Sequence, residues 1–130
     1  MGIKAEGLVP LLEIFDMPTS LKFYCDMLGF EVVASAGEDW AMLRLGGASL
    51  MLNTRYESDD RPPEPDAAAV VAHADTELFI DCPNVDEAYR HLRSLGIEVE
   101  PPRVSHYGMK QISVEDPDGF RLWFQHAVQK

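Results

Sequence analysis

The side chains best suited to chemistry in this sequence lie in short segments that alternate between apolar and polar residues. Glu77 begins one such segment, ELFID, and Trp123 stands in the middle of another, RLWFQ. Successive side chains of a β-strand point to opposite faces of a sheet, so Glu77 shares a face with Phe79. By the same rule Trp123 shares a face with Arg121. A carboxylate among aromatic rings can bind a cation, or can act as a general base where burial raises its pKa toward neutrality.

The same alternation divides the predicted strands into two faces. The first face is almost uniformly apolar and is expected to pack against helices: Pro10, Leu12, Ile14, Leu50, Leu52, Leu78, Ile80, Ile112, Val114, Leu122 and Phe124. The second face mixes large apolar groups with polar ones: Val9, Leu11, Glu13, Ser49, Met51, Asn53, Glu77, Phe79, Asp81, Gln111, Ser113, Glu115, Arg121, Trp123 and Gln125. Apolar walls with a few hydrogen-bonding groups are typical of a small-molecule pocket, so we expect a ligand on the second face. The alternative is that this face meets water or a partner chain.

The sequence also repeats itself. Residues 12–33 (LEIFDMPTSLKFYCDMLGFEVV) and 78–100 (LFIDCPNVDEAYRHLRSLGIEVE) each contain a strand, a polar junction, an amphipathic helix, the dipeptide Leu-Gly and a second strand. Three strands are expected after each helix: residues 31–35, 40–45 and 48–54, and residues 99–104, 109–115 and 120–126. The predicted class is therefore α+β, with two βαβββ modules forming a curved mixed sheet around a concave cleft and helices on the outer face.

Local signals mark where the two helices begin and end. Asp16 and Asn84 are predicted N-caps, and Gly29 and Gly96 are predicted to end the helices in the left-handed conformation. The expected buried stripes are Leu21, Tyr24, Cys25 and Leu28 on the first helix and Val85, Ala88, Tyr89, Leu92 and Leu95 on the second. The terminal strand follows the turn DPDG, in which glycine tolerates a positive φ.

The modules, residues 8–54 and 76–126, are expected to form a single domain that spans residues 1–130. A proline-rich acidic loop, residues 55–75, joins them and is predicted to contain a helical turn at residues 67–72. Such a long loop is either a plain linker or a flap over a site.

Composition excludes several classes of partner. The 130-residue chain carries a net charge of −11, which repels phosphate backbones and anionic lipid, so neither nucleic acid nor a membrane is expected to bind. We find no apolar run near the roughly 20 residues that a membrane span needs, and the first residues lack the features of a secretory signal. A cytoplasmic protein is expected. The two cysteines, Cys25 and Cys82, have no metal-ligand spacing and are expected to be buried thiols.

The paired βαβββ halves, with SLKFYCDMLGFEV in the first and VEDPDGFRLWFQ at the end of the second, resemble the glyoxalase/bleomycin resistance protein/dioxygenase group, the vicinal oxygen chelate superfamily. The resemblance covers residues 8–125. In the metal enzymes of that group four inward residues hold a divalent ion, and the four places fall here on Val9, Met51, Glu77 and Trp123. Only Glu77 can bind such an ion, since a thioether is a poor ligand for hard divalent cations and an open site still needs about three protein ligands. The resemblance thus implies a metal-free member without a cofactor, unless His73, His106 or Asp81 rebuilds the site, and it implies a homodimer.

Two functions from different classes remain open at this point, with a binding protein favoured over an enzyme. The first is a protein that binds or sequesters a cationic or aromatic small molecule; its expected ligand-binding residues are Val9, Leu11, Met51, Glu77, Phe79, His106, Tyr107, Arg121 and Trp123. The second is a glyoxalase-like lyase or isomerase acting on a small carbonyl compound, with Glu77 as the catalytic base and help from the loop VSHYGMK, or with a rearranged metal site. The alternatives without a functional role are a structural ion pair of Glu77 with Arg121 or Arg44, and an ordinary loop histidine at His106.

Overall fold

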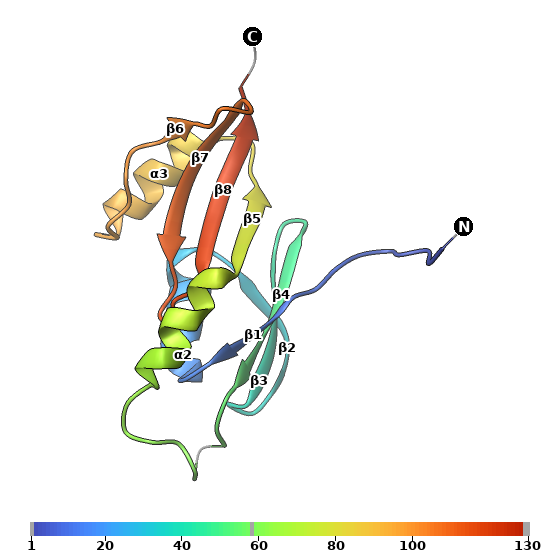
Figure 1. The fold of residues 1–130 in the computed structure, drawn as a ribbon, viewed down its shortest axis with the longest axis vertical. Helices are drawn as coiled ribbons and strands as arrows, with labels where there is room; N and C mark the ends of the chain where they lie inside the picture. The colour runs from blue at the N-terminus through green and yellow to red at the C-terminus, as the bar shows by residue number, and fades with distance from the viewer. Residues whose placement is uncertain (1, 58, 129–130) are drawn as a thin grey trace. The chain divides into compact units, whose positions relative to one another are not determined.

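Each half of the sequence forms a four-stranded mixed sheet with a helix packed on one face (Figure 1). The computed structural model describes residues 2–57 and 59–128, and the chain divides into two compact units between Pro63 and Glu64. The predicted α+β class with two βαβββ halves is confirmed.

In the first unit the sheet has the order β1-β4-β3-β2, with β1 parallel to β4 and the other pairs antiparallel. Its strands are β1 (Leu11–Ile14), β2 (Glu31–Ala36), β3 (Trp40–Leu45) and β4 (Ala48–Thr54). The second unit repeats this order as β5-β8-β7-β6, again with the first strand parallel to the last. Its strands are β5 (Glu77–Asp81), β6 (Arg103–Val104), β7 (Met109–Glu115) and β8 (Arg121–Ala127).

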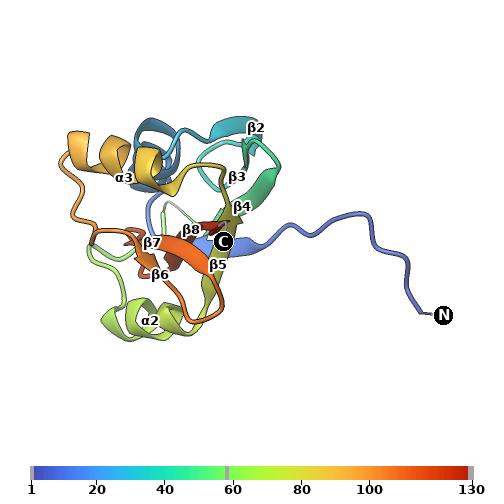
Figure 2. The ribbon, with the colours of Figure 1, turned by 90° about the horizontal axis from the view of Figure 1, so that it is seen from above.

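The division of side chains into two faces is confirmed at most positions. Of the residues expected against the helices, those on β1, β4, β7 and β8 are buried: Leu12, Ile14, Leu50, Leu52, Ile112, Val114, Leu122 and Phe124. On β5 the expected core residues Leu78 and Ile80 are only half-buried. In the second unit α3 (Val85–Ser94) packs against β7 and β8 (Figure 2).

The first helix differs from the prediction in its buried stripe. It starts as α1 (Met17–Leu21) and continues as a π-helical segment, Lys22–Met27, in which the Leu28 N–H bonds to the Phe23 oxygen five residues back (3.1 Å). Phe23 is buried, whereas the expected Leu21 and Cys25 are half-buried. The wider π turn changes which side chains of residues 22–27 face inward. The predicted stripe was wrong at Cys25 because it assumed 3.6 residues per turn through the π-helical segment.

Two expectations for the second unit were also wrong. The strand expected at residues 99–104 is reduced to Arg103–Val104, because Pro101 and Pro102 have no N–H to donate to β7. Leu95, expected in the buried stripe of α3, is 46% exposed at the end of that helix.

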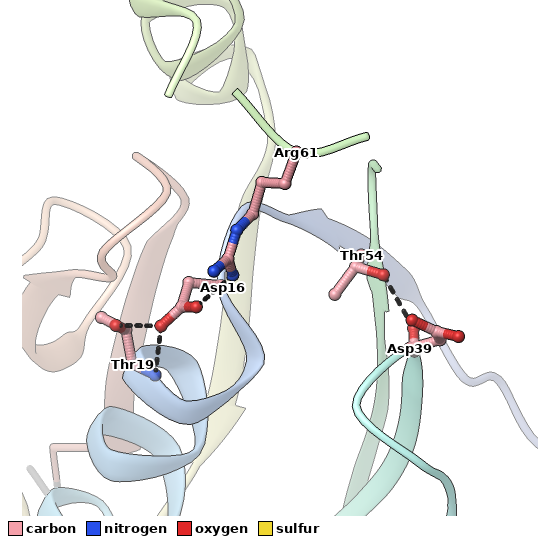
Figure 3. Close-up of polar contacts among 5 residues, drawn as sticks. All are labelled: Asp16, Thr19, Asp39, Thr54 and Arg61. Carbon is pink, nitrogen blue, oxygen red and sulfur yellow. Dashed lines mark hydrogen bonds and ion pairs between the residues drawn. The ribbon is translucent and has the colours of Figure 1, made fainter. Parts of the chain in front are cut away.

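The predicted caps form as expected. Asn84 Oδ1 accepts the Glu87 N–H (3.0 Å), and Asp16 Oδ2 accepts both the N–H (3.1 Å) and the hydroxyl (2.5 Å) of Thr19 (Figure 3). Arg61 forms an ion pair with Asp16, so this cap also holds the segment that leaves the first unit. Chiefly the hydrogen bond from the Thr19 side chain, with further help from Arg61, lowers the pKa of Asp16 below its usual value of 3.8.

The helical turn expected between the modules is α2 (Ala67–Ala72), which continues as a 3₁₀ turn, His73–Asp75. It packs on the DPDG turn: His73 Nδ1 donates to the Asp118 backbone oxygen (2.6 Å), and its ring stacks on Phe120 at 4.0 Å. Gly119 has a φ of +91°, and a Cβ there would lie 2.4 Å from the Val70 carbonyl oxygen. Glycine is therefore required twice, for its φ and for the close approach of α2.

Candidate functional site

The face of the second sheet that points away from α3 carries four of the nine predicted site residues: Glu77, Phe79, Arg121 and Trp123. We call it the open face of the second sheet; it consists of Glu77, Phe79, Asp81, Met109, Gln111, Ser113, Glu115, Arg121, Trp123 and Gln125. Strand register places Phe79 beside Trp123 and Asp81 beside Gln125, because β5 and β8 run parallel and in step (Figure 1). All of these side chains are half-buried or exposed.

The centre of the open face is an aromatic stack with a carboxylate attached. The rings of Phe79 and Trp123 lie 5.6 Å apart and only 4° from parallel. The indole Nε1 donates a hydrogen bond to Glu77 Oε1 (3.0 Å). The Phe79 side chain remains 49% exposed. A flat aromatic surface and a negative charge thus lie within contact distance of each other.

Arg121 lies on the same rung of the sheet as Glu77 but bonds elsewhere. Its register partners are Glu77 on β5 and Glu115 on β7, and its guanidinium donates to Ser113 Oγ (2.9 Å). The Glu77 carboxylate accepts a hydrogen bond from the indole, whereas the structural alternative considered from the sequence was an ion pair with Arg121 or Arg44.

Two depressions are lined in part by residues of the open face, and neither is lined by the stacked rings themselves. One, of about 490 Å³, includes Asp81 and Gln125 of the open face together with Cys82, Met109 and His126. The other, of about 570 Å³, includes Ser113 and Arg121 together with residues 98–101. The Phe79–Trp123 stack lies between the open-face residues that contribute to each depression.

The hairpin before β7 brings the two predicted loop residues to this region. His106 packs edge-on against the Tyr107 ring, with centroids 5.2 Å apart. The Tyr107 hydroxyl accepts a hydrogen bond from Gln111 Nε2 (2.6 Å). Tyr107 is thereby connected to the open face, whereas the described contact of His106 is with the tyrosine ring.

The remaining predicted residues lie in the first unit. Leu11 is the register partner of Met51, and both belong to the corresponding open face of the first sheet, while Val9 precedes β1 and is 38% exposed. Sequence reasoning missed two large side chains on this face, Trp40 and Met42, which pair with Asn53 and Met51. The alternation of residues 40–45 was signal enough to find them.

The four places implied for metal ligands do not assemble a metal site within either unit. Glu77 is engaged by Trp123, and Met51 lies among the apolar groups Leu11 and Met42. In residues 2–57 and 59–128 no three His, Cys, Asp or Glu side chains are grouped so that they could hold a metal ion.

Neither cysteine has the character of a nucleophile. Burial raises the pKa of the Cys25 thiol above its usual value of 9.0, and burial likewise raises that of Cys82, which lines the first depression. Both are free thiols, and both are half-buried where the sequence predicted buried ones. A neutral thiol is a small apolar group, which agrees with the expected structural role.

The geometry supports recognition better than catalysis. Glu77 is exposed, so the burial that a general base at this position was expected to need is not provided by its own unit. What the site offers is a planar aromatic surface, a carboxylate, a guanidinium and several amides. Such groups bind and orient a small molecule.

Comparison with known proteins identifies the family of the chain. The family described as Glyoxalase/Bleomycin resistance protein/Dioxygenase superfamily matches residues 11–124. The uncharacterized protein YaeR of Escherichia coli (strain K12) is 31% identical over 120 residues, which cover 82% of this chain and 84% of that protein. A bleomycin resistance protein of Geobacillus stearothermophilus is 30% identical over 130 residues, covering 93% and 96%.

Solved structures share the fold at lower identity. The bleomycin-binding protein of bleomycin-producing Streptomyces verticillus, crystallised with copper(II)-bleomycin, superposes with a TM-score of 0.72 at 22% identity, covering 98% of this chain and 100% of that one. A lactoylglutathione lyase of Agrobacterium tumefaciens gives a TM-score of 0.69 at 18% identity, with 94% of each chain covered. A binding protein and an enzyme are thus built on the same fold. In the part of the chain that the structure describes, no helix is long and apolar enough to cross a membrane.

Proposed function

The chain belongs to the glyoxalase/bleomycin resistance protein/dioxygenase superfamily, and we propose that it is a binding protein that sequesters a planar aromatic cation on the open face of the second sheet. The observation that carries the proposal is the exposed Phe79–Trp123 stack with the Glu77 carboxylate bonded to its indole edge. Similarity to bleomycin resistance proteins at 30% identity supports a binding role.

The physical reason is a match of shape and charge. A planar ligand can lie against the ring surface, where aromatic contact supplies much of its buried area. A positive charge near the rings and near Glu77 gains about 0.5–2 kcal/mol. The net charge of −11 adds a long-range attraction for cations and repels anions.

The test uses two flat probes that differ in charge, 1-methylquinolinium and neutral quinoline, with calorimetric titration at neutral pH. Wild type should bind the cation more tightly than the neutral ring. Trp123→Ala should weaken binding of both probes about tenfold, which corresponds to 1.4 kcal/mol.

A matched pair of charge variants separates the local carboxylate from the overall field. Glu77→Gln keeps an oxygen for the indole N–H and removes the charge, so it should weaken only the cation, by about 0.2–1 kcal/mol. Glu87→Gln makes the same change of net charge on α3 and should have no effect. The proposal would be refuted if Trp123→Ala bound each probe as tightly as wild type does.

Two further parts of the proposal concern the setting of the protein. We propose a homodimer, supported by apolar side chains that remain exposed on the first unit, Leu11 (48%), Val32 (46%) and Val33 (42%). We propose a cytoplasmic location, supported by two cysteines that are both free thiols.

A further inference from the structure

Four side chains form a hydrogen-bonded row across the open face of the second sheet, which we call the polar row: Asp81, Gln125, Gln111 and Tyr107. Gln125 Nε2 donates to Asp81 Oδ1 (3.3 Å), and Gln111 Nε2 donates both to Gln125 Oε1 (2.9 Å) and to the Tyr107 hydroxyl (2.6 Å). Asp81 and Gln125 stand two residues beyond Phe79 and Trp123 on the same strands. The polar row therefore runs about 7 Å from the aromatic stack, within reach of a ligand that lies on it.

The Asp81 carboxylate at one end determines which group donates and which accepts in the hydrogen bonds between the two glutamines of the polar row. An ionised Asp81 can only accept, so the Gln125 amide must turn its nitrogen toward it and its oxygen toward Gln111. Gln111 must then present its own nitrogen to that oxygen. Reversing either amide would bring two oxygens together, so the orientation of both amides follows from Asp81.

The groups that these hydrogen bonds do not use determine what the polar row can offer to a ligand. The two bonds of the Gln111 amide use both hydrogens of its nitrogen, and the carbonyl oxygen Oε1 is the acceptor that this side chain has left to offer. The Tyr107 hydroxyl accepts from Gln111 and so keeps its own hydrogen for donation. His106 packs against the Tyr107 ring, and the Gly108 N–H bonds the Ser105 oxygen (3.0 Å), which together hold the tyrosine in place.

An acceptor beside a donor is complementary to a primary carboxamide, which carries an N–H donor and a carbonyl acceptor. We infer that the polar row selects ligands that bear a carboxamide on the planar aromatic cation. In this arrangement Gln111 and Tyr107 contact the carboxamide, and Asp81 is a positioning residue that acts through Gln125. The inference rests on the proposed function, since the aromatic stack must hold the ring.

The test compares three cations by calorimetric titration: 1-methylquinolinium, its 3-carboxamide and its 3-methyl ester. The carboxamide should bind wild type about tenfold more tightly than the unsubstituted ring. The ester, which has an acceptor and no N–H donor, should gain clearly less. Gln111→Met keeps the length of the side chain without its polar atoms, and it should bind all three cations with the affinity of the unsubstituted ring.

A second variant, Asp81→Asn, tests whether Asp81 positions the other side chains of the polar row. Its expected effect is a change of ligand preference, which a residue that only stabilises the fold would not produce. In Asp81→Asn the terminal group can donate or accept, so the row can reverse and Gln111 can present its nitrogen to the ligand. The preference for carboxamide over ester should then shrink severalfold. Loss of the Asp81 charge weakens all three cations alike, so the ratio of carboxamide to ester affinity is the quantity that reports the positioning role. A preference equal to that of wild type would overturn the role of Asp81.

The outcomes separate this inference from the proposed function. If 1-methylquinolinium binds through Trp123 and the carboxamide binds no more tightly, the polar row does not select carboxamides and the proposed function stands. If no cation binds wild type, both are overturned. The comparison of the three cations on wild type needs no variant, so it decides the matter even if Gln111→Met fails to fold.

Discussion

At the scale of single residues, neighbours on β8 perform opposite tasks. Phe124 is 6% exposed on the helix side, whereas Trp123 stacks on Phe79 on the open face. Phe124→Ala should therefore lower the free energy of unfolding by about 3–5 kcal/mol, because it leaves a cavity in the core. Urea denaturation measures the change, and Trp123→Ala is the control, expected to lose about 1 kcal/mol with its single indole bond. Similar losses in both variants would contradict the assignment of faces.

Asp16 gives a residue-scale prediction about pH. Its pKa is lowered in the folded state, so its contribution to stability is complete above 3.8 and is lost as the pH falls through the folded value. Asp16→Asn can still cap the helix and does not titrate. The stability advantage of wild type over this variant should shrink in urea titrations as the pH falls from neutrality to below 3.8.

Arg61→Gln is the matched control for Asp16. It removes the ion pair and keeps the bonds from Thr19, which are the largest cause of the shift. Most of the pH dependence should therefore persist in Arg61→Gln. A flat pH profile in this variant would assign the effect to Arg61 instead.

At the scale of elements, the packing of α2 on the terminal turn is the contact most open to test. Gly119→Ala places a Cβ at a φ of +91° and 2.4 Å from the Val70 oxygen. Gly96→Ala has a comparable φ of +78° with nothing within 4 Å. Both variants should lose about 1 kcal/mol to backbone strain, and Gly119→Ala should lose a further 1–3 kcal/mol, roughly, to the clash.

Thermal unfolding of the two glycine variants provides the measurement. Equal losses would mean that α2 moves aside without cost and is not firmly docked on the turn. The predicted excess would show that the segment between the modules, beyond residue 66, is part of the second unit and more than a plain linker.

At the scale of the whole molecule, the first prediction concerns metal. Three of the four places where related enzymes are expected to bear ligands hold Val9, Met51 and Trp123. Protein purified without chelators should carry no stoichiometric zinc, nickel, iron or manganese by elemental analysis. One equivalent of metal that EDTA removes together with ligand binding or activity would contradict the metal-free proposal.

The second whole-molecule prediction concerns assembly. Small sheets with exposed apolar groups gain stability by pairing, and symmetric dimers are the commonest closed oligomers. Light scattering at micromolar concentration should therefore give twice the mass of the chain. Leu11→Ser with Val32→Ser should shift the equilibrium toward the single chain if these exposed groups are in the interface. A stable single chain in wild type would refute the dimer.

Much of this molecule is determined locally and was predictable from sequence alone. The caps at Asp16 and Asn84 and the positive φ of Gly119 depend on residues a few positions apart, and so does the alternation that sorts each strand into two faces. The family followed from the repeated halves and is confirmed.

What tertiary structure decided involves residues far apart in the chain. The bond from Trp123 to Glu77 joins residues 46 positions apart, and no sequence pattern specifies which of its neighbours a side chain will choose. The π-helical segment depends on how Phe23 and Leu28 fit the core, and the direction of the polar row depends on the register of β5, β8 and β7. Alternation determines the face on which a side chain lies, but only packing and strand register determine its hydrogen-bond partner.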